Sequence, residues 1–158
     1  PGEKRLDLTQ ISENLTKLMA RAKSILPDAE IVMELGRYLV AEAGIYVCEI
    51  VDKKISRGET FLIANGGLHH HLAVSGNFGQ VIRKNYPVCI GNRVTANEYE
   101  IVNVVGPLCT PLDILANKMK LPVSNVGDLV VIFQSGAYGF TASPHLFLSQ
   151  PQAVEIFL

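Results

Sequence analysis

Apolar residues recur near the start of the chain at the spacing of a helix. Between residues 7 and 26 they fall mostly three or four positions apart, which places them on one face of an amphipathic helix. Asp7, followed three residues later by Gln10, resembles a capping box, and Pro27 marks the end of the segment. A short apolar run at 31–33 follows and predicts a buried strand of the kind found in parallel sheets.

Strand-like patterns dominate the rest of the chain, after a short helical turn at 38–43. Glycine and proline separate the β-rich runs, which lie at 45–51, 61–63, 88–90, 99–105, 129–133 and 154–157. We therefore expect a mainly β fold, in which residues 37–158 form a C-terminal β-sandwich or Greek-key barrel domain. One helix and one strand do not make a domain, so residues 1–36 are expected to be the end of a larger α/β domain.

Composition narrows the class of protein. The chain has 158 residues, 48% of them hydrophobic, which is enough for one sizeable core. Its net charge is −1 and it has no basic stripe, which argues against nucleic acid or a membrane surface as a partner. Three cysteines without a CxxC pair favour a reduced, cytoplasmic compartment. Because the chain begins with Pro1 and shows no leader, we expect a trimmed chain or a fragment.

Three consecutive histidines, His69, His70 and His71, raise the question of a metal site. Adjacent side chains on a strand or helix do not converge on one ion, and zinc ligands normally come from spaced positions. An internal polar turn is therefore favoured, which leaves room for one histidine near a ligand, and no metal site is predicted.

A cysteine lies directly before a predicted helix. Thr110 has the chemistry of a helix N-cap, Pro111 suits the first helical position, and Asp113 is placed for the reciprocal cap. Cys109 would then meet the positive end of the helix dipole, which favours a thiolate. A buried, inert cysteine at a well-capped helix start fits the spacing equally well.

Two further segments carry groups that suit an anion. Glu34, Gly36 and Arg37 follow the predicted strand within four residues. The glycine permits close approach of a ligand, and the guanidinium matches phosphate or carboxylate. Tyr138 is flanked by glycines after the run at 129–133, where a phenol can donate to a phosphate oxygen. Each segment alone also fits a plain interpretation, as a strand end with a surface arginine or as a turn with a core tyrosine.

Taken together, these segments resemble one family, the alanine-racemase-like (fold-type III) pyridoxal-phosphate decarboxylases of diaminopimelate, ornithine, arginine and related amino acids. Three motifs carry the resemblance, in this order: Glu34-x-Gly36-Arg37, Gly106-Pro107-x-Cys109 and Gly136-Ala137-Tyr138-Gly139. The similarity runs along the whole chain. Residues 65–72 fall where the family has an Asp-x-Gly-Met segment, and the run from there to 88 is similar to an exosortase-associated subgroup.

The resemblance implies a two-domain, homodimeric enzyme with active sites at the subunit interface. An N-terminal (β/α)8 barrel would carry pyridoxal 5'-phosphate, and residues 1–36 would be the last helix and strand of that barrel, the rest of which this chain lacks. Residues 37–158 would be the C-terminal β-domain that completes the site.

The resemblance also implies residue roles. Glu34 would pair with the pyridinium nitrogen of the cofactor. Gly36, Arg37 and Tyr138 would hold the cofactor phosphate. Cys109 would reach across the dimer into the partner's site and act as the general acid.

Two positions depart from the family pattern. Thr110, at the substrate-binding position, stands where members that act on a free distal amine have Asp or Glu. The carboxylate-binding arginine of diaminopimelate decarboxylases aligns near Ala73. We therefore expect a substrate that is neither diaminopimelate nor a plain basic amino acid, but an amino acid whose far end is masked by a carrier or an acyl group.

A further departure concerns the lysine that forms a Schiff base with the cofactor. None of the lysines in this chain lies in the Ala-Val-Lys-like strand that carries it in the family. The chain alone is therefore expected to have no decarboxylase activity. The alternative interpretation is a non-catalytic β-domain that binds a partner chain or completes another subunit's site. A racemase is less favoured, because no motif for its tyrosine base is present.

Overall fold

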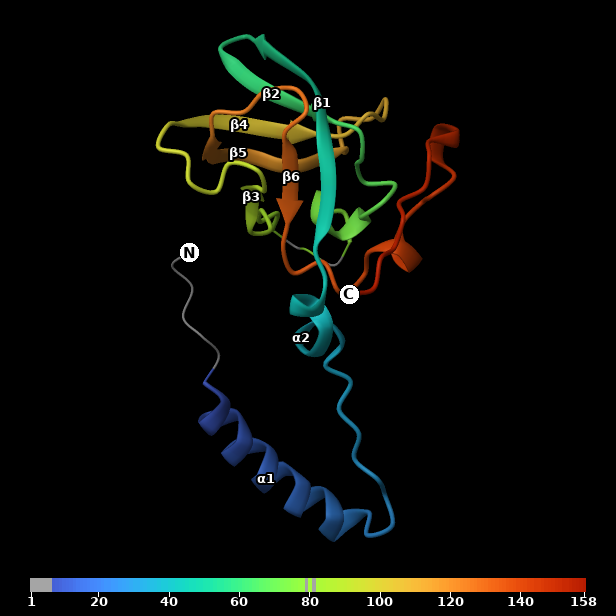
Figure 1. Cartoon of the computed structure of the whole chain (residues 1–158). Coiled ribbons are helices and arrows are strands. Elements are labelled where there is room, and N and C mark those ends of the chain that lie inside the picture. Colours follow the sequence, from blue (N-terminus) through green and yellow to red (C-terminus); the bar gives the residue numbers. More distant parts are fainter. Residues whose placement is uncertain (1–6, 79, 81) are drawn as a thin grey trace. The chain divides into compact units, whose positions relative to one another are not determined.

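The computed structural model describes residues 7–78, 80 and 82–158, and the chain divides into two compact units, Pro1–Leu35 and Gly36–Leu158. The first unit contains the helix α1 (Leu8–Ile25), and the second contains a six-stranded sheet (Figure 1). Across the described part of the chain, no helix combines the length and the apolar character needed to span a membrane.

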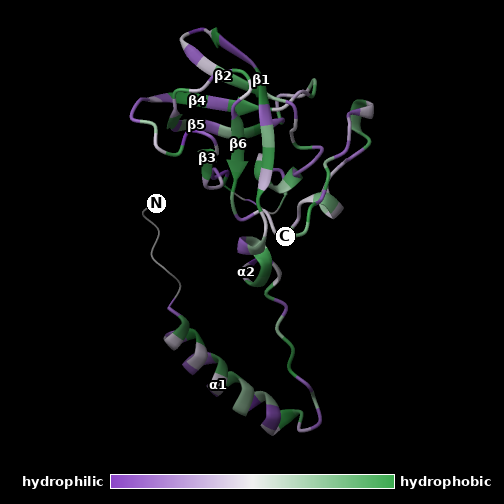
Figure 2. Ribbon diagram, viewed as in Figure 1, coloured by the Kyte–Doolittle hydropathy of each residue, from purple (hydrophilic) through white to green (hydrophobic). Residues whose placement is uncertain are grey.

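The predicted amphipathic helix is confirmed. The Asp7 carboxylate caps α1 by accepting the backbone N–H groups of Thr9, at 3.0 Å, and Gln10, at 3.3 Å. Hydrophobic and hydrophilic residues alternate along α1 (Figure 2). No residue of α1 is buried, and the large apolar side chains of Leu18 and Met19 are exposed. The described part of the first unit therefore buries no residue on the apolar face of this helix.

The predicted strand at 31–33 is wrong for this chain. The segment from 26 to 35 has no regular secondary structure, and the side chains of Ile31, Val32 and Met33 are exposed. A strand of a parallel sheet is stabilised by ladder partners and by cover on both faces, and the described part of the first unit supplies neither. The assignment of residues 1–36 to the end of a barrel stays a prediction.

The second unit begins with helical turns and continues as a sheet. The turns are α2 (Gly36–Val40) and η1 (Ala41–Ala43). The strands are β1 (Tyr46–Ser56), β2 (Glu59–Ala64), β3 (Val88–Ile90), β4 (Tyr99–Val105), β5 (Ile114–Pro122) and β6 (Leu129–Ile132). Short 3-10 turns lie between them or after them, at Leu72–Ser75, Phe140–Ala142 and Phe147–Ser149.

The sheet is nearly closed, which confirms the predicted mainly β fold. Its order is β3-β6-β1-β2-β4-β5, and every pair is antiparallel except β2 with β4. The two end strands, β3 and β5, approach each other. Just before β3, the Asn85 side chain donates to the Asn117 carbonyl at 2.7 Å and accepts from its N–H at 2.9 Å. This amide pairs with the free edge of β5 and so helps to close the barrel.

The core lies inside the sheet and comes from the inward positions of each strand. Ile50, Leu62, Val102, Leu115 and Ile132 are among its fully buried members. Their burial on alternate positions supplies the apolar contact that holds the strands together.

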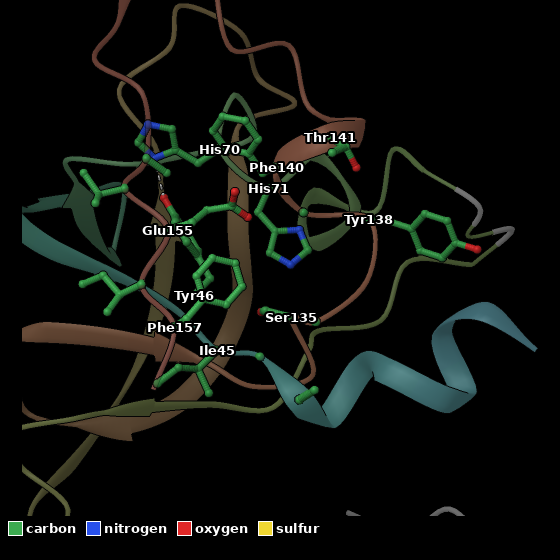
Figure 3. A pocket seen from close by; sticks show the side chains of 17 residues that line it. Ile45, Tyr46, His70, His71, Ser135, Tyr138, Phe140, Thr141, Glu155 and Phe157 are labelled. Carbon is green, nitrogen blue, oxygen red and sulfur yellow. Dashed lines mark hydrogen bonds between the residues drawn. The ribbon is translucent and has the colours of Figure 1, made fainter.

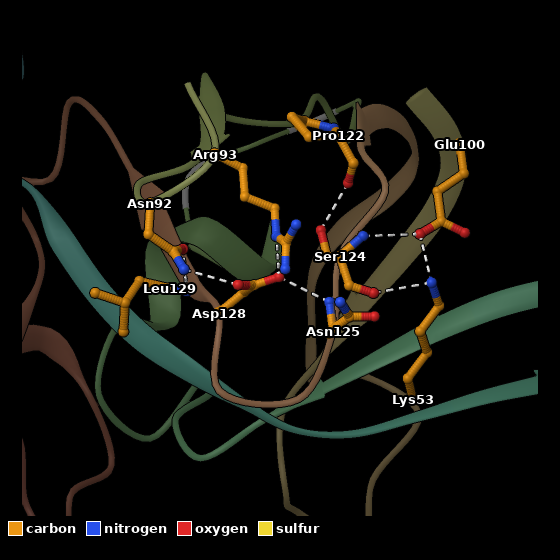
Figure 4. Close-up of polar contacts among 9 residues, drawn as sticks. All are labelled: Lys53, Asn92, Arg93, Glu100, Pro122, Ser124, Asn125, Asp128 and Leu129. Atoms are coloured by element: carbon orange, nitrogen blue, oxygen red, sulfur yellow. Dashed lines mark hydrogen bonds and ion pairs between the residues drawn. The ribbon is translucent and has the colours of Figure 1, made fainter. Parts of the chain in front are cut away.

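Polar side chains fix the loops at one end of the sheet (Figure 4). Asp128 accepts hydrogen bonds from Asn92, Arg93 and the backbone N–H of Asn125. Beside it, the Lys53 ammonium donates to Glu100 at 2.6 Å. Because these groups satisfy one another, this cluster serves the packing of the loops.

The helix predicted after Cys109 is wrong, and β5 takes its place. The Thr110 hydroxyl accepts the N–H of Leu112, two residues on, which makes a local turn instead of a helix cap. Asp113 is buried and binds the backbone N–H of the distant Leu68. The run at 154–157, predicted as a strand, pairs with no strand in the part of the chain that the structure describes.

Candidate functional site

The first half of the site is fixed where α2 and η1 meet the loop after β6. The Gly136 N–H donates to the Ala41 carbonyl at 2.9 Å, and the Ser135 N–H donates to the Gly44 carbonyl at 2.9 Å. A Cβ at Gly136 would lie 1.9 Å from the Val40 carbonyl oxygen. Only glycine allows this approach of two backbones, so the sequence itself specifies the contact.

That contact brings together three residues that the sequence predicted to share a site. The Arg37 guanidinium carbon lies 5.1 Å from the centre of the Tyr138 ring. A Cβ at Gly36 would lie 2.9 Å from the Tyr138 hydroxyl oxygen, so bare backbone faces the phenol there. Tyr138 adopts a left-handed conformation with φ of 56°, which is uncommon for a bulky residue.

A second tyrosine completes this group and was missed from the sequence. The Arg37 guanidinium donates to the Tyr86 hydroxyl and lies over the Tyr86 ring, 5.5 Å from its centre. Tyr86 is 7% exposed and belongs to the core. Nothing in the sequence separates it from an ordinary core tyrosine, because its contact with Arg37 spans 49 positions. We call Gly36, Arg37, Tyr86 and Tyr138 the Arg37 cluster.

The histidine run forms a turn, as predicted, but two of its side chains are buried. His70 bonds the Tyr46 hydroxyl at 2.9 Å and the Pro151 carbonyl at 2.7 Å. His69 and His71 are buried with no hydrogen-bond partner on either ring nitrogen. Burial, and the nearby charges of His70 and His145, lower the pKa of His69 to about 4. Burial, and then the charge of Arg37, lower the pKa of His71 to about 4.

His71 therefore stays neutral at ordinary pH and packs edge-on against Tyr46 and Tyr86, with ring centres 5.9 Å apart in each case. In the described residues, no group of three or more potential metal ligands converges. A cavity of about 370 Å³ opens beside His71 (Figure 3). Its wall includes Tyr138 from the Arg37 cluster and residues 153–157 from the C-terminal segment.

The loop that carries Cys109 is held by one buried carboxylate. Asp113 accepts the backbone N–H of Leu68 at 2.7 Å and that of Leu108 at 2.9 Å. A Cβ at Gly67 or Gly106 would lie 2.3 Å or 2.2 Å from the carboxylate, so both positions require glycine. Burial raises the pKa of Asp113, and the two backbone N–H groups oppose that rise. The segments around 67 and 106–113 are joined in this way.

The predicted site residues fall into three groups. Gly36, Arg37 and Tyr138 lie together. Cys109 is exposed on the Asp113 loop beside Thr110, and no hydrogen bond or ring contact recorded for the described residues links them to Arg37. The helix expected to activate Cys109 through its dipole is absent, because a turn and then strand β5 come directly after this residue. Glu34 is exposed in the first unit, and its role stays a prediction.

Comparison with known proteins shows which family the chain resembles. The profile described as "Pyridoxal-dependent decarboxylase, C-terminal sheet domain" matches residues 31–136. An L-glutamyl-[BtrI acyl-carrier protein] decarboxylase from Niallia circulans is 40% identical over 98% of this chain and 37% of its own length. A 2-[(L-alanin-3-ylcarbamoyl)methyl]-2-hydroxybutanedioate decarboxylase from Staphylococcus aureus is 34% identical over 84% of this chain and 34% of its own length.

Solved structures show the same fold. The diaminopimelate decarboxylase of M. jannaschii, in complex with L-lysine, superimposes with a TM-score of 0.77 and 20% identity over 92% of this chain. The lysine/ornithine decarboxylase of Vibrio vulnificus, complexed with cadaverine, gives 0.75 and 22% over 96%. This chain covers 32% and 38% of those two chains, so it spans about a third of the length of the proteins it matches.

Proposed function

Because the chain belongs to the pyridoxal-dependent decarboxylases, of which it carries the C-terminal sheet domain, we propose that it is the C-terminal portion of an amino-acid decarboxylase. The complete enzyme releases carbon dioxide from the α-carbon of an amino acid or an amino-acid derivative. One observation carries this proposal: Gly36 and Tyr138, from two distant segments of the chain, lie beside the cationic side chain of Arg37. The relatives and the family match favour this function over a non-catalytic β-domain.

The Arg37 cluster suits the phosphate of pyridoxal 5'-phosphate. Arg37 supplies a cation with a fork of donors, and Tyr138 supplies a phenol hydroxyl. A Cβ at Gly36 would crowd the Tyr138 hydroxyl, so glycine keeps the bare backbone and the phenol close enough to meet one oxyanion. Glu34 would pair with the ring nitrogen of the cofactor, which would keep that nitrogen protonated. When bound, the cofactor supplies an electron sink for the pair released as carbon dioxide leaves.

Cys109 is the proton donor in this proposal. Its loop is fixed by Asp113 while its side chain faces outward, where no described residue of the chain covers it. An outward thiol on a rigid loop suits a role in the site of a second subunit. In the homodimer, Cys109 of one subunit would deliver a proton to the α-carbon at the partner's cofactor, replacing the lost carboxylate.

The substrate in this proposal has a masked far end. Thr110 carries no charge, and its hydroxyl already accepts the N–H of Leu112. Ala73 is fully buried in a 3-10 turn and offers no group to a distal carboxylate. Neither position can therefore bind a free distal amine or carboxylate by charge. The Niallia relative, whose name gives a carrier-linked glutamyl substrate, supports a substrate linked to a carrier or an acyl group.

In this proposal the complete protein also has a barrel domain with the Schiff-base lysine, and it works in the cytoplasm as a homodimer. The test measures carbon dioxide release by that complete protein. We expect turnover of aminoacyl groups linked to a carrier protein, little turnover of free diaminopimelate, lysine or ornithine, and none by the 158-residue chain alone. Efficient turnover of the free amino acids would contradict the proposed substrate. No turnover of any amino-acid derivative, in a protein that has the lysine, would contradict the decarboxylase function itself.

A further inference from the structure

We propose that Tyr86 is a further phosphate-binding residue, which holds Arg37 in place and donates its own hydroxyl proton to the same anion. This inference rests on the proposed function, since the anion is the phosphate of pyridoxal 5'-phosphate. The starting observation is the contact in which the Arg37 guanidinium donates to the Tyr86 hydroxyl.

The proton of that hydroxyl is unassigned. A phenol has one O–H donor and can also accept hydrogen bonds. The Tyr86 hydroxyl oxygen accepts a hydrogen bond from Arg37. Among the described residues, no acceptor is recorded for the hydroxyl proton of Tyr86. A cation that donates to a hydroxyl also strengthens that hydroxyl as a donor. Because the Tyr86 hydroxyl meets the guanidinium, its O–H proton is within reach of an anion bound to Arg37.

The position of Tyr86 is fixed by both of its neighbours. Asn85 makes two hydrogen bonds to the backbone of Asn117 in β5. The Pro87 carbonyl accepts the N–H of Phe133 at 2.9 Å. The Tyr86 ring is 7% exposed and packs edge-on against His71. A binding group held in this way loses little freedom when a ligand arrives, which raises its contribution to affinity.

The guanidinium lies over two phenol rings. The Arg37 carbon is 5.5 Å from the centre of the Tyr86 ring and 5.1 Å from that of the Tyr138 ring. A cation with two phenols beside it matches a phosphate group, which has several oxygens to satisfy at once. His71, the next ring behind Tyr86, is neutral at ordinary pH and adds no second charge.

The test compares binding of pyridoxal phosphate with binding of pyridoxal, which lacks the phosphate, in the apo form of the complete protein. In Tyr86→Phe we expect the Kd for pyridoxal phosphate to rise about tenfold. The Kd for pyridoxal should stay within about twofold of wild type. The phosphorus NMR resonance of the bound cofactor should also move. Tyr99→Phe is the matched control, since Tyr99 lies on β4 with its ring under Lys120 and should change neither Kd.

Arg37→Gln separates this inference from the proposed function. If Arg37→Gln weakens binding of pyridoxal phosphate and Tyr86→Phe does not, the inference about Tyr86 is wrong and the phosphate site stands. If neither variant changes that Kd, the proposed phosphate site itself is wrong.

A second measurement avoids any folding defect of the variants. Wild-type protein labelled at the tyrosine ring carbon that bears the hydroxyl should show the Tyr86 signal moving with pyridoxal phosphate and not with pyridoxal. An unmoved signal would overturn the role of Tyr86.

Discussion

The Arg37 cluster and the Cys109 loop are built in opposite ways. In the cluster, side chains from α2, from the segment before β3 and from the loop after β6 contact one another directly. In the loop, Asp113 fixes the backbone, but the thiol of Cys109 faces outward. The Arg37 cluster is therefore assembled from contacts within the second unit. The Cys109 loop instead presents an exposed thiol that the described part of the chain leaves uncovered.

The largest expected effect is on the Cys109 loop. Asp113→Ala removes a buried carboxylate that accepts two backbone N–H groups, and each such bond is worth about 1.5–3 kcal/mol. We expect a loss of about 3–5 kcal/mol in the free energy of unfolding, measured by urea denaturation. Asp52→Ala is the control. The Asp52 carboxylate is exposed, and the one hydrogen bond recorded for it among the described residues comes from the backbone N–H of the next residue. A loss below about 0.5 kcal/mol in Asp113→Ala would show that the loop is held by something else.

The next effect separates chemistry from folding in the same loop. Cys109→Ser in the complete protein should lower kcat by about 100-fold, the lower range for loss of a positioned general acid. Because the side chain is exposed, the midpoint of thermal unfolding should not move. Steady-state kinetics and calorimetry on the same preparation give both values. A kcat within about threefold of wild type would remove Cys109 from the reaction.

A third effect tests how the Arg37 cluster is assembled. In Gly136→Ala the new Cβ would meet the Val40 carbonyl oxygen at 1.9 Å, so α2 and the loop after β6 must separate. Overpacking of this kind costs about 1–3 kcal/mol, and binding of pyridoxal phosphate should weaken with it. Gly58→Ala is the control. Gly58 lies at a turn with open space around it, so the stability lost there comes from its φ of 79° alone. Equal cofactor binding in Gly136→Ala and wild type would break the link between this contact and the site.

The smallest expected effect is a pH dependence of folding stability, caused by His71, which packs against Tyr86 of the Arg37 cluster. The pKa of His71 is lowered from 6.5 to about 4, so the folded state disfavours its charged form. The stability linked to this histidine is fully present above pH 6.5 and is lost as the pH falls toward 4. At about pH 5 the loss should be on the order of 1–2 kcal/mol.

His71→Leu should therefore flatten the fall in stability between those pH values, measured as the urea midpoint at each pH. The lowered pKa of His69 contributes a similar fall that this variant retains. An unchanged pH profile in His71→Leu would mean that the His71 ring is charged or solvated in the folded protein.

The sequence predicted the parts whose signals are local. Helix α1 follows from its apolar spacing and its Asp7 cap, and strands β1 and β2 follow from the β-rich runs at 45–51 and 61–63. The helix after Cys109 failed because Thr110 and Asp113 serve a turn with the same residue types that serve a cap. Strand β5 was missed because its alanine, lysine, methionine and leucine residues favour helix as readily as strand.

The candidate site also has residues that the sequence predicted and a residue that it did not. The resemblance to a family pointed to Gly36, Arg37 and Tyr138, and the structure shows why these residues meet: Gly136 allows the two segments to touch. Tyr86 had no local signal, since its role depends on a contact made only after the barrel closes. Long-range side-chain contacts of this kind follow from packing, and a single sequence does not display them.

The most direct test of the central claim is a crystal structure of the complete protein with pyridoxal phosphate bound. We expect the cofactor phosphate to lie against the Gly36 backbone, with Arg37 and Tyr138 donating to its oxygens. A phosphate bound elsewhere, with Arg37 and Tyr138 turned away from it, would show that the Arg37 cluster is not the phosphate site.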